Sequence, residues 1–106
     1  MQMDILTEIR DKVNRRQFEF SKHALNQSII REISVFELEE AVLSYSEIIE
    51  DYPEDKYGPS CLILGFTKQA RPLHILMSYP IRPVLKIITL YEPSPSAWKD
   101  NRERIK

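Results

Sequence analysis

The chain has 106 residues, of which 42% are hydrophobic and 29% are charged, so there is room for one domain with one core. No apolar run approaches the roughly 20 residues that span a bilayer, and the first four residues lack the basic start and apolar stretch of a secretion signal. The single cysteine, Cys61, cannot form an internal disulfide and lies in an apolar run, which predicts a buried thiol. These features predict a single domain over residues 1–106, located in the cytoplasm.

The net charge of -1 hides an asymmetry between the two halves of the chain. Residues 1–53 carry 6 Lys or Arg against 11 Asp or Glu, whereas residues 54–106 carry 9 against 5. A basic surface opposite an acidic helical layer would suit an anionic ligand such as RNA. The alternative is ordinary solvated charge.

Apolar residues at helical spacing predict three helices before residue 46. The first covers residues 3–16. The second covers residues 22–32, with Ser21 as its N-cap, and the third covers residues 35–45, opening at a capping-box pattern that starts at Ser34. The residues expected on their apolar faces are Ile5, Leu6, Ile9 and Val13, then Ala24, Leu25, Ile29 and Ile30, then Val35, Leu38, Val42 and Tyr45.

The apolar pattern after Tyr45 is typical of strands. The expected strands cover residues 47–52, 60–67, 72–79 and 84–91. Connections this short between strands require an antiparallel arrangement. Phe18 and Phe20 are expected in a short extended link, and the polar, basic tail over residues 94–106 is expected to form a short helix after Ser96. The chain is therefore predicted to be an α+β domain, with helices over residues 3–45 packed on an antiparallel sheet of about four strands over residues 47–91.

The residues that can carry acid–base chemistry are few. His23 near the start of the second helix and His74 in a strand are candidate general acids or bases, and each has the alternative of a structural hydrogen bond. Period-2 alternation places His74 on the face opposite Leu73 and Ile75. The histidines and Cys61 lack zinc-ligand spacing, and no phosphate-loop motif is present, so we expect no metal or cofactor.

Lys86 is the most informative basic residue, because a lysine inside an apolar strand must reach water or a partner. Alternation along that strand predicts that Lys86 shares a face with Ile88 and Leu90, opposite Thr89 and Tyr91.

Other cations and aromatic residues are candidate RNA contacts. The candidates for phosphate binding, with ordinary loop or tail charge as the alternative, are Arg71, Arg82, Lys99, Arg102 and Arg104. Tyr57, Tyr91 and Trp98 are candidates for stacking on bases, with packing in the core as the alternative.

An ordered series of segments resembles the family called domain of unknown function 4258 over about residues 18–99. The segments are Phe20-Ser21-Lys22-His23-Ala24, Arg31-Glu32-Ile33-Ser34, Ile49-Glu50-Asp51-Tyr52-Pro53, Tyr57-Gly58-Pro59-Ser60-Cys61-Leu62, Arg71-Pro72-Leu73-His74 and Lys86-Ile87-Ile88-Thr89-Leu90-Tyr91-Glu92-Pro93 with Trp98. That family is similar to the RelE and BrnT toxins of bacterial toxin–antitoxin pairs. The resemblance implies helices followed by a curved antiparallel sheet of the RelE type.

The resemblance also implies an activity and partners. The activity is RNA cleavage, often of messenger RNA on the ribosome, and the partner is a small antitoxin with a zinc finger or a helix-turn-helix. His23, His74, Lys86 and Tyr91 match positions expected to act in catalysis, and Arg31 and Trp98 match RNA-binding positions. Family members usually carry a further arginine near Gln27, which this chain lacks.

Three functions therefore remain open at the level of sequence. The leading hypothesis is a toxin that acts as a metal-independent endoribonuclease, in which a ribose 2′-hydroxyl attacks the adjacent phosphate. The second is a non-catalytic module that binds protein or RNA on the same scaffold. The third is a subunit that pairs through an exposed sheet edge.

Overall fold

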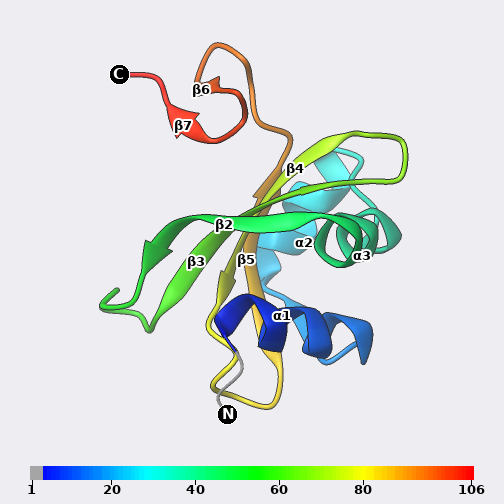
Figure 1. Cartoon of the computed structure of the whole chain (residues 1–106). Helices are drawn as coiled ribbons and strands as arrows, with labels where there is room; N and C mark the ends of the chain where they lie inside the picture. The colour runs from blue at the N-terminus through cyan, green and yellow to red at the C-terminus, as the bar shows by residue number, and fades with distance from the viewer. Residues whose placement is uncertain (1–3) are drawn as a thin grey trace.

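Three helices come first in the computed structural model, which describes residues 4–106 (Figure 1). They are α1 (Ile5–Asn14), α2 (Lys22–Ile30) and α3 (Val35–Ser44). Ser21 Oγ accepts a hydrogen bond from the Ala24 N–H, and Ser34 forms the expected capping box with Glu37. The predicted helices and caps are therefore confirmed, with ends one or two residues inside the predicted ranges. Residue 3, where the first helix was expected to begin, lies outside the described residues.

A five-stranded sheet packs against the helices. Its strands are β1 (Phe18–Phe20), β2 (Ser46–Tyr52), β3 (Ser60–Phe66), β4 (Pro72–Ser78) and β5 (Leu85–Tyr91), in the order β1-β5-β4-β3-β2. The α+β prediction is confirmed. The sheet has one strand more than the predicted four or so antiparallel strands, and the additional strand is β1. The segment expected to be a link forms β1 and pairs parallel with β5, because three alternating residues give too short a pattern to distinguish a strand from a link.

The tail forms a hairpin and not the predicted short helix. Its strands are β6 (Trp98–Lys99) and β7 (Glu103–Arg104). Asp100 and Asn101 between them have φ angles of 52° and 62°, and the Arg102 N–H bonds the Lys99 carbonyl. This is the geometry of a tight hairpin turn with both central residues left-handed, which Asp and Asn tolerate better than most residues.

The inner face of the sheet carries the core. Buried residues of α1 and α3 pack there against β3, β4 and β5, and buried Cys61 belongs to the same cluster. Helix α3 lies so close to β3 that a Cβ built on Gly65 would be 2.3 Å from the Ala41 carbonyl oxygen. Burial also raises the pKa of the Cys61 thiol to about 12, which leaves it protonated.

Helix α2 lies beside β5 and contributes little to the core. Ala24 and Ser28 are its buried residues. Leu25, Ile29 and Ile30 are 52%, 69% and 72% exposed, so the predicted apolar face of this helix is wrong for three of its four residues. Small residues allow α2 to approach the strand closely, and the larger side chains then point to solvent. Within residues 4–106, no helix is long and apolar enough to cross a bilayer.

A β-bulge on β5 changes which residues share a face. Leu76 of β4 pairs with Thr89, but Met77 pairs with Ile87, so Ile88 is an extra residue. Alternation therefore slips by one position. Leu90 is buried in the core, whereas exposed Lys86 lies on the outer face of the sheet with Tyr91. The predicted grouping of Lys86 with Leu90 is wrong for this reason.

Candidate functional site

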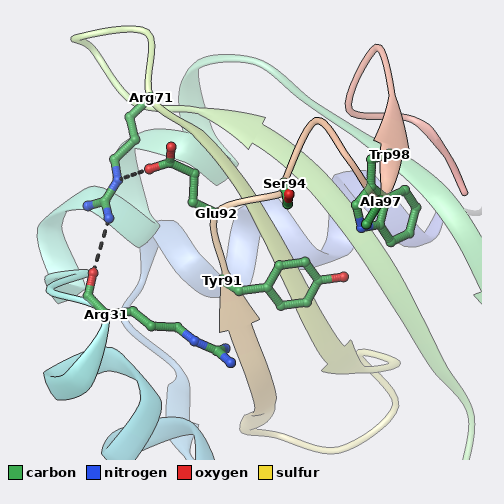
Figure 2. Close-up of a pocket in the computed structure, with 7 residues that line it drawn as sticks. All are labelled: Arg31, Arg71, Tyr91, Glu92, Ser94, Ala97 and Trp98. Atoms are coloured by element: carbon green, nitrogen blue, oxygen red, sulfur yellow. Dashed lines mark hydrogen bonds and ion pairs between the residues drawn. The ribbon is translucent and has the colours of Figure 1, made fainter. Parts of the chain in front are cut away.

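A pocket of about 490 Å³ opens at the end of β5, between the end of α2 and the start of the tail (Figure 2). The residues that line it are Arg31, Arg71, Tyr91, Glu92, Ser94, Ala97 and Trp98. Four of these, Arg31, Arg71, Tyr91 and Trp98, are among the site residues expected from the sequence. The pocket brings together residues that lie 60 or more positions apart only because α2 runs alongside β5.

Arg31 supplies the pocket's available positive charge. It follows the last residue of α2, and its Nη1 donates a 2.8 Å hydrogen bond to the Leu90 carbonyl. The guanidinium lies 5.8 Å from the centre of the Tyr91 ring, and the two side chains extend in the same direction in Figure 2. Among residues 4–106, no carboxylate forms an ion pair with Arg31. Its remaining N–H groups are therefore suited to an anion that enters the pocket.

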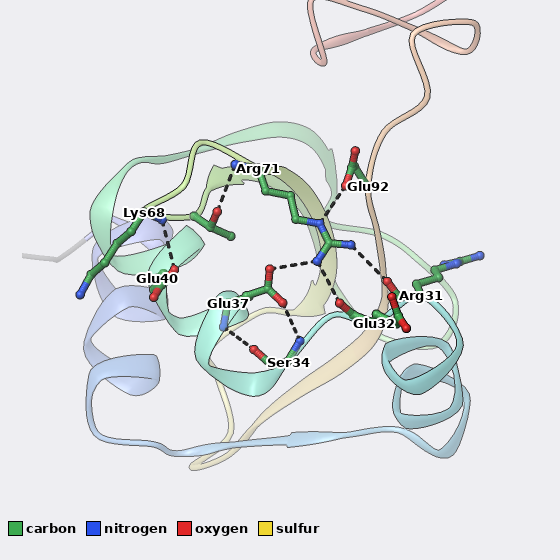
Figure 3. A network of polar contacts seen from close by, with 9 residues as sticks. Arg31, Glu32, Ser34, Glu37, Glu40, Lys68, Arg71 and Glu92 are labelled. Atoms are coloured by element: carbon green, nitrogen blue, oxygen red, sulfur yellow. Dashed lines mark hydrogen bonds and ion pairs between the residues drawn. The ribbon is translucent and has the colours of Figure 1, made fainter.

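Arg71 is, by contrast, occupied with the protein itself (Figure 3). Its Nε donates to Glu92, its Nη1 to Glu37 and to the Glu32 carbonyl, and its Nη2 to the Arg31 carbonyl, at 2.8–3.1 Å. These bonds use four of the five N–H groups of a guanidinium. The bonds to the Arg31 and Glu32 carbonyls fix the backbone just after α2, where Glu32 adopts a left-handed φ of 53°. Arg71 therefore positions Arg31.

The same network affects the ionisation of Glu37. Its partial burial opposes the charged form, but the Ser34 N–H and the Arg71 guanidinium outweigh that effect and hold the pKa of Glu37 below its usual value. The carboxylate is therefore charged at neutral pH, which preserves its bond to Arg71.

Tyr91 connects the pocket to His74 on the outer face of the sheet. The Tyr91 hydroxyl lies 3.2 Å from His74 Nδ1, and His74 Nε2 lies 2.6 Å from the carbonyl oxygen of Asn101. His74 is completely buried, on the face opposite Leu73 and Ile75 as predicted. Burial lowers the pKa of His74 and raises that of Tyr91. Both groups are therefore neutral near pH 7, and the Tyr91 hydroxyl is the side-chain group hydrogen-bonded to the imidazole among the described residues.

The tail covers His74. The Trp98 ring packs edge-on against the imidazole at a centroid distance of 4.4 Å, and only 6% of the tryptophan is exposed. The Arg104 guanidinium lies over the Trp98 ring, 4.7 Å from its centre, and forms two hydrogen bonds to Glu50 of β2, at 2.7 and 3.0 Å. The bond to Arg104 holds the pKa of Glu50 below its usual value. The expected stacking of a base on Trp98 is disfavoured by this position, because the side chain is buried and Arg104 lies over its ring.

The other expected site residues lie outside the pocket. Exposed His23 is on α2 but does not line it. Lys86 is ion-paired to Glu19 of β1 at 2.9 Å, roughly 16 Å from Tyr91 along the strand. Tyr57 and Arg82 are exposed in the β2–β3 and β4–β5 connections, at the opposite end of the sheet (Figure 1).

Internal ion pairs neutralise much of the opposite charge that the sequence places in its acidic first half and its basic second half. Four of the pairs join an acidic residue of the first half to a basic residue of the second: Glu37–Arg71, Glu19–Lys86, Glu47–Arg102 and Glu50–Arg104. The opposite charges of the two halves therefore hold them together. This arrangement leaves Arg31 as the pocket arginine with no carboxylate partner among the described residues.

Several contributors to this site were not predicted from the sequence, among them Asn101, Glu50 and the Arg71 partners Glu37 and Glu92. The Asp100-Asn101 dipeptide was a signal for a hairpin turn in the tail. No local pattern indicates that Glu50 binds Arg104, because the pair spans 54 positions. Within residues 4–106, no three His, Cys, Asp or Glu side chains are placed to hold a metal ion together.

The fold and the pocket define a small α+β domain with an arginine- and tyrosine-lined surface site. The profile of the family described as "Domain of unknown function (DUF4258)" matches residues 20–92, and the chain belongs to this family. The matched range contains Arg31, Arg71, His74 and Tyr91, whereas Trp98 and Asn101 lie beyond it. No curated protein and no solved structure matches the chain significantly.

Proposed function

We propose that this protein is the toxin of a bacterial type II toxin–antitoxin pair, and that its pocket cleaves RNA as a metal-independent endoribonuclease in the cytoplasm. The observation that carries the proposal is the placement of Arg31, without a carboxylate partner, over a tyrosine whose hydroxyl is bonded to a buried neutral histidine. The resemblance of the family to RelE and BrnT toxins supports the same class of reaction.

The proposed reaction begins with proton transfer from the ribose 2′-hydroxyl to the Tyr91 oxygen, as Tyr91 passes its own proton to His74 Nδ1. The 2′-oxygen then forms a bond to phosphorus, and the bond from phosphorus to the 5′-oxygen breaks. A water molecule in the open pocket protonates the 5′-oxygen, and the hydroxide that results takes a proton from Tyr91 as His74 Nδ1 returns one to Tyr91, which restores both residues. The products are a 2′,3′-cyclic phosphate and a 5′-hydroxyl.

Arg31 stabilises the negative charge that gathers on the phosphate oxygens during this step. Its guanidinium is anchored by one hydrogen bond to Leu90, so it is held in place before the substrate binds. The proposed reaction assigns no role to the predicted site residues that lie outside the pocket, among them His23, Lys86, Tyr57 and Arg82.

The test uses purified protein, single-stranded RNA and a chelator, with a second arm containing translating ribosomes, because the expected substrate includes messenger RNA on the ribosome. We expect the wild type to produce cyclic-phosphate ends. Arg31→Gln and Tyr91→Phe should each reduce the rate by about 10²-fold or more, by loss of charge stabilisation or of the proton acceptor.

Arg82→Gln is the matched control for Arg31→Gln, since it removes an exposed arginine at the other end of the sheet. This variant should cleave at the wild-type rate. The proposal fails if the wild type leaves RNA intact in both arms and is harmless on expression in bacteria. It fails equally if Arg31→Gln and Tyr91→Phe cleave like the wild type.

A protein-binding module is the second candidate function, favoured by the exposed apolar residues Leu25, Ile29 and Ile30 on α2. Under the toxin proposal these residues would contact a small cognate antitoxin with a zinc finger or helix-turn-helix. Co-purification with the product of the neighbouring gene, lost in Ile29→Asp, supports such a partner. Wild-type binding with no RNA cleavage selects the module over the enzyme.

A further inference from the structure

The tail hairpin determines which nitrogen of His74 carries the proton. A carbonyl oxygen only accepts hydrogen bonds, so the 2.6 Å contact between His74 Nε2 and the Asn101 oxygen requires a proton on Nε2. A neutral imidazole holds one such proton, and Nδ1 is then left with a lone pair. That lone pair faces the Tyr91 hydroxyl at 3.2 Å.

The position of the Asn101 carbonyl follows from the shape of the turn. Asp100 and Asn101 both have left-handed φ angles, and the turn is closed by the hydrogen bond from Arg102 N–H to the Lys99 oxygen, 2.9 Å long. A second bond, from the Ile105 N–H to the Ala97 oxygen, continues the hairpin. In this turn the carbonyl of the second central residue, Asn101, is directed at the imidazole.

Side chains of the hairpin hold the turn on the sheet. Trp98 packs against the His74 ring, and Arg104 joins the tail to Glu50 of β2. The turn is therefore fixed both in its own geometry and in its place over His74.

We propose that Asn101 is a positioning residue, whose backbone carbonyl selects the Nε2-protonated tautomer of His74 and so makes His74 the acceptor for the Tyr91 proton. The catalytic consequence rests on the proposed function, while the selection of the tautomer does not. With the other tautomer, Nδ1–H would face the tyrosine, and the histidine would have no lone pair to receive its proton.

Two substitutions of Asn101 separate the backbone effect from the side chain. Asn101→Gly removes the side chain but favours the left-handed conformation, whereas Asn101→Val disfavours that conformation strongly. Arg104→Gln loosens the hairpin by a second route, through loss of its bonds to Glu50. Ring-nitrogen NMR of histidine-labelled protein reports the tautomer of His74, and exposed His23 serves as an internal reference.

We expect one fixed tautomer with a bare Nδ1 in the wild type and in Asn101→Gly. Asn101→Val and Arg104→Gln should give averaged tautomers, because the carbonyl that fixes the proton on Nε2 is no longer held at the imidazole. In the cleavage assay Asn101→Val should lose about tenfold or more while Asn101→Gly keeps its rate. Amide exchange of the inner strands, unchanged in all variants, will show that the core remains folded.

The inference is overturned if wild-type His74 carries its proton on Nδ1, or if Asn101→Val and Arg104→Gln both keep the wild-type tautomer. It is also overturned if Asn101→Gly changes the tautomer as Asn101→Val does. A wild type that holds the fixed tautomer but cuts no RNA contradicts the proposed function and leaves the tautomer assignment standing.

Discussion

The two faces of the sheet are covered in different ways. The inner face packs against α1 and α3 through completely buried apolar side chains, including Ile9, Leu38 and Ile75. Around His74 the outer face is covered by a short hairpin, held by Trp98 and by ion pairs of Arg102 and Arg104. The comparison shows where the molecule keeps its stability and where it can adjust. The inner face maintains the fold, whereas the outer face places a buried histidine behind a solvent-open pocket.

Gly65→Ala, a substitution on the inner face, is expected to cause the largest loss of folding stability. The new methyl would meet the Ala41 carbonyl, which belongs to the α3 backbone and cannot rotate away. We expect a fall in the free energy of unfolding of about 3 kcal/mol or more, measured by urea denaturation.

Gly58→Ala is the comparison for that variant. Gly58 has a φ of 110° and open space around it, so the loss comes from backbone strain alone, about 1–2 kcal/mol. If Gly65→Ala costs no more than Gly58→Ala, helix α3 does not approach the sheet as closely as described.

A second pair of variants compares truncations on the two faces. Ile75→Ala removes a core side chain and should cost about 3–4 kcal/mol. Trp98→Ala removes a larger side chain but should cost only about 1–2 kcal/mol globally, because the hairpin can detach while the sheet stays folded. Hydrogen exchange should accelerate over residues 97–105 and not in β3. Equal acceleration in β3 would mean that the outer cover is as integral to the fold as the core.

A third pair of variants compares the two arginines that line the pocket, Arg71 and Arg31. Arg71→Gln loses two carboxylate partners and two carbonyl partners, and we expect a cost of about 2 kcal/mol in urea denaturation. Arg31→Gln loses one bond to Leu90 and should cost about 0.5–1 kcal/mol. The reverse order would assign the structural role to Arg31 and leave Arg71 as the group available to a ligand.

These differences explain which features the sequence could predict. Helices α1 and α3 and the four longer strands each bury one apolar face. The spacing of the apolar residues within each segment is therefore enough to predict the element. Strand β1 is too short to do so, and α2 approaches β5 through Ala24 and Ser28, so its large apolar residues gave a misleading signal.

The site was partly predictable for a related reason. Arg31, His74 and Tyr91 are residue types suited to the chemistry, and the structure places Arg31 and Tyr91 at one pocket with His74 hydrogen-bonded behind Tyr91. Lys86 was misplaced because one extra residue in β5 reverses alternation, and a bulge leaves no mark in the pattern. The contact with Asn101 depends on how the tail folds back across 27 positions, which local sequence does not state.

The smallest expected effect is the pH dependence of stability that His74 causes. Burial lowers the pKa of His74 in the folded state, so the unfolded chain binds a proton more readily below about pH 6.5. The contribution is fully present above that pH and is lost as the pH falls toward the folded pKa. Glu50 has a lowered pKa as well, but its contribution is lost only below pH 4.5. The free energy of unfolding should therefore decline between pH 7 and 5 in the wild type and in His23→Gln, and stay flat in His74→Gln. A decline that persists in His74→Gln would show that the outer-face histidine is not the buried, neutral group on which the proposed proton transfer depends.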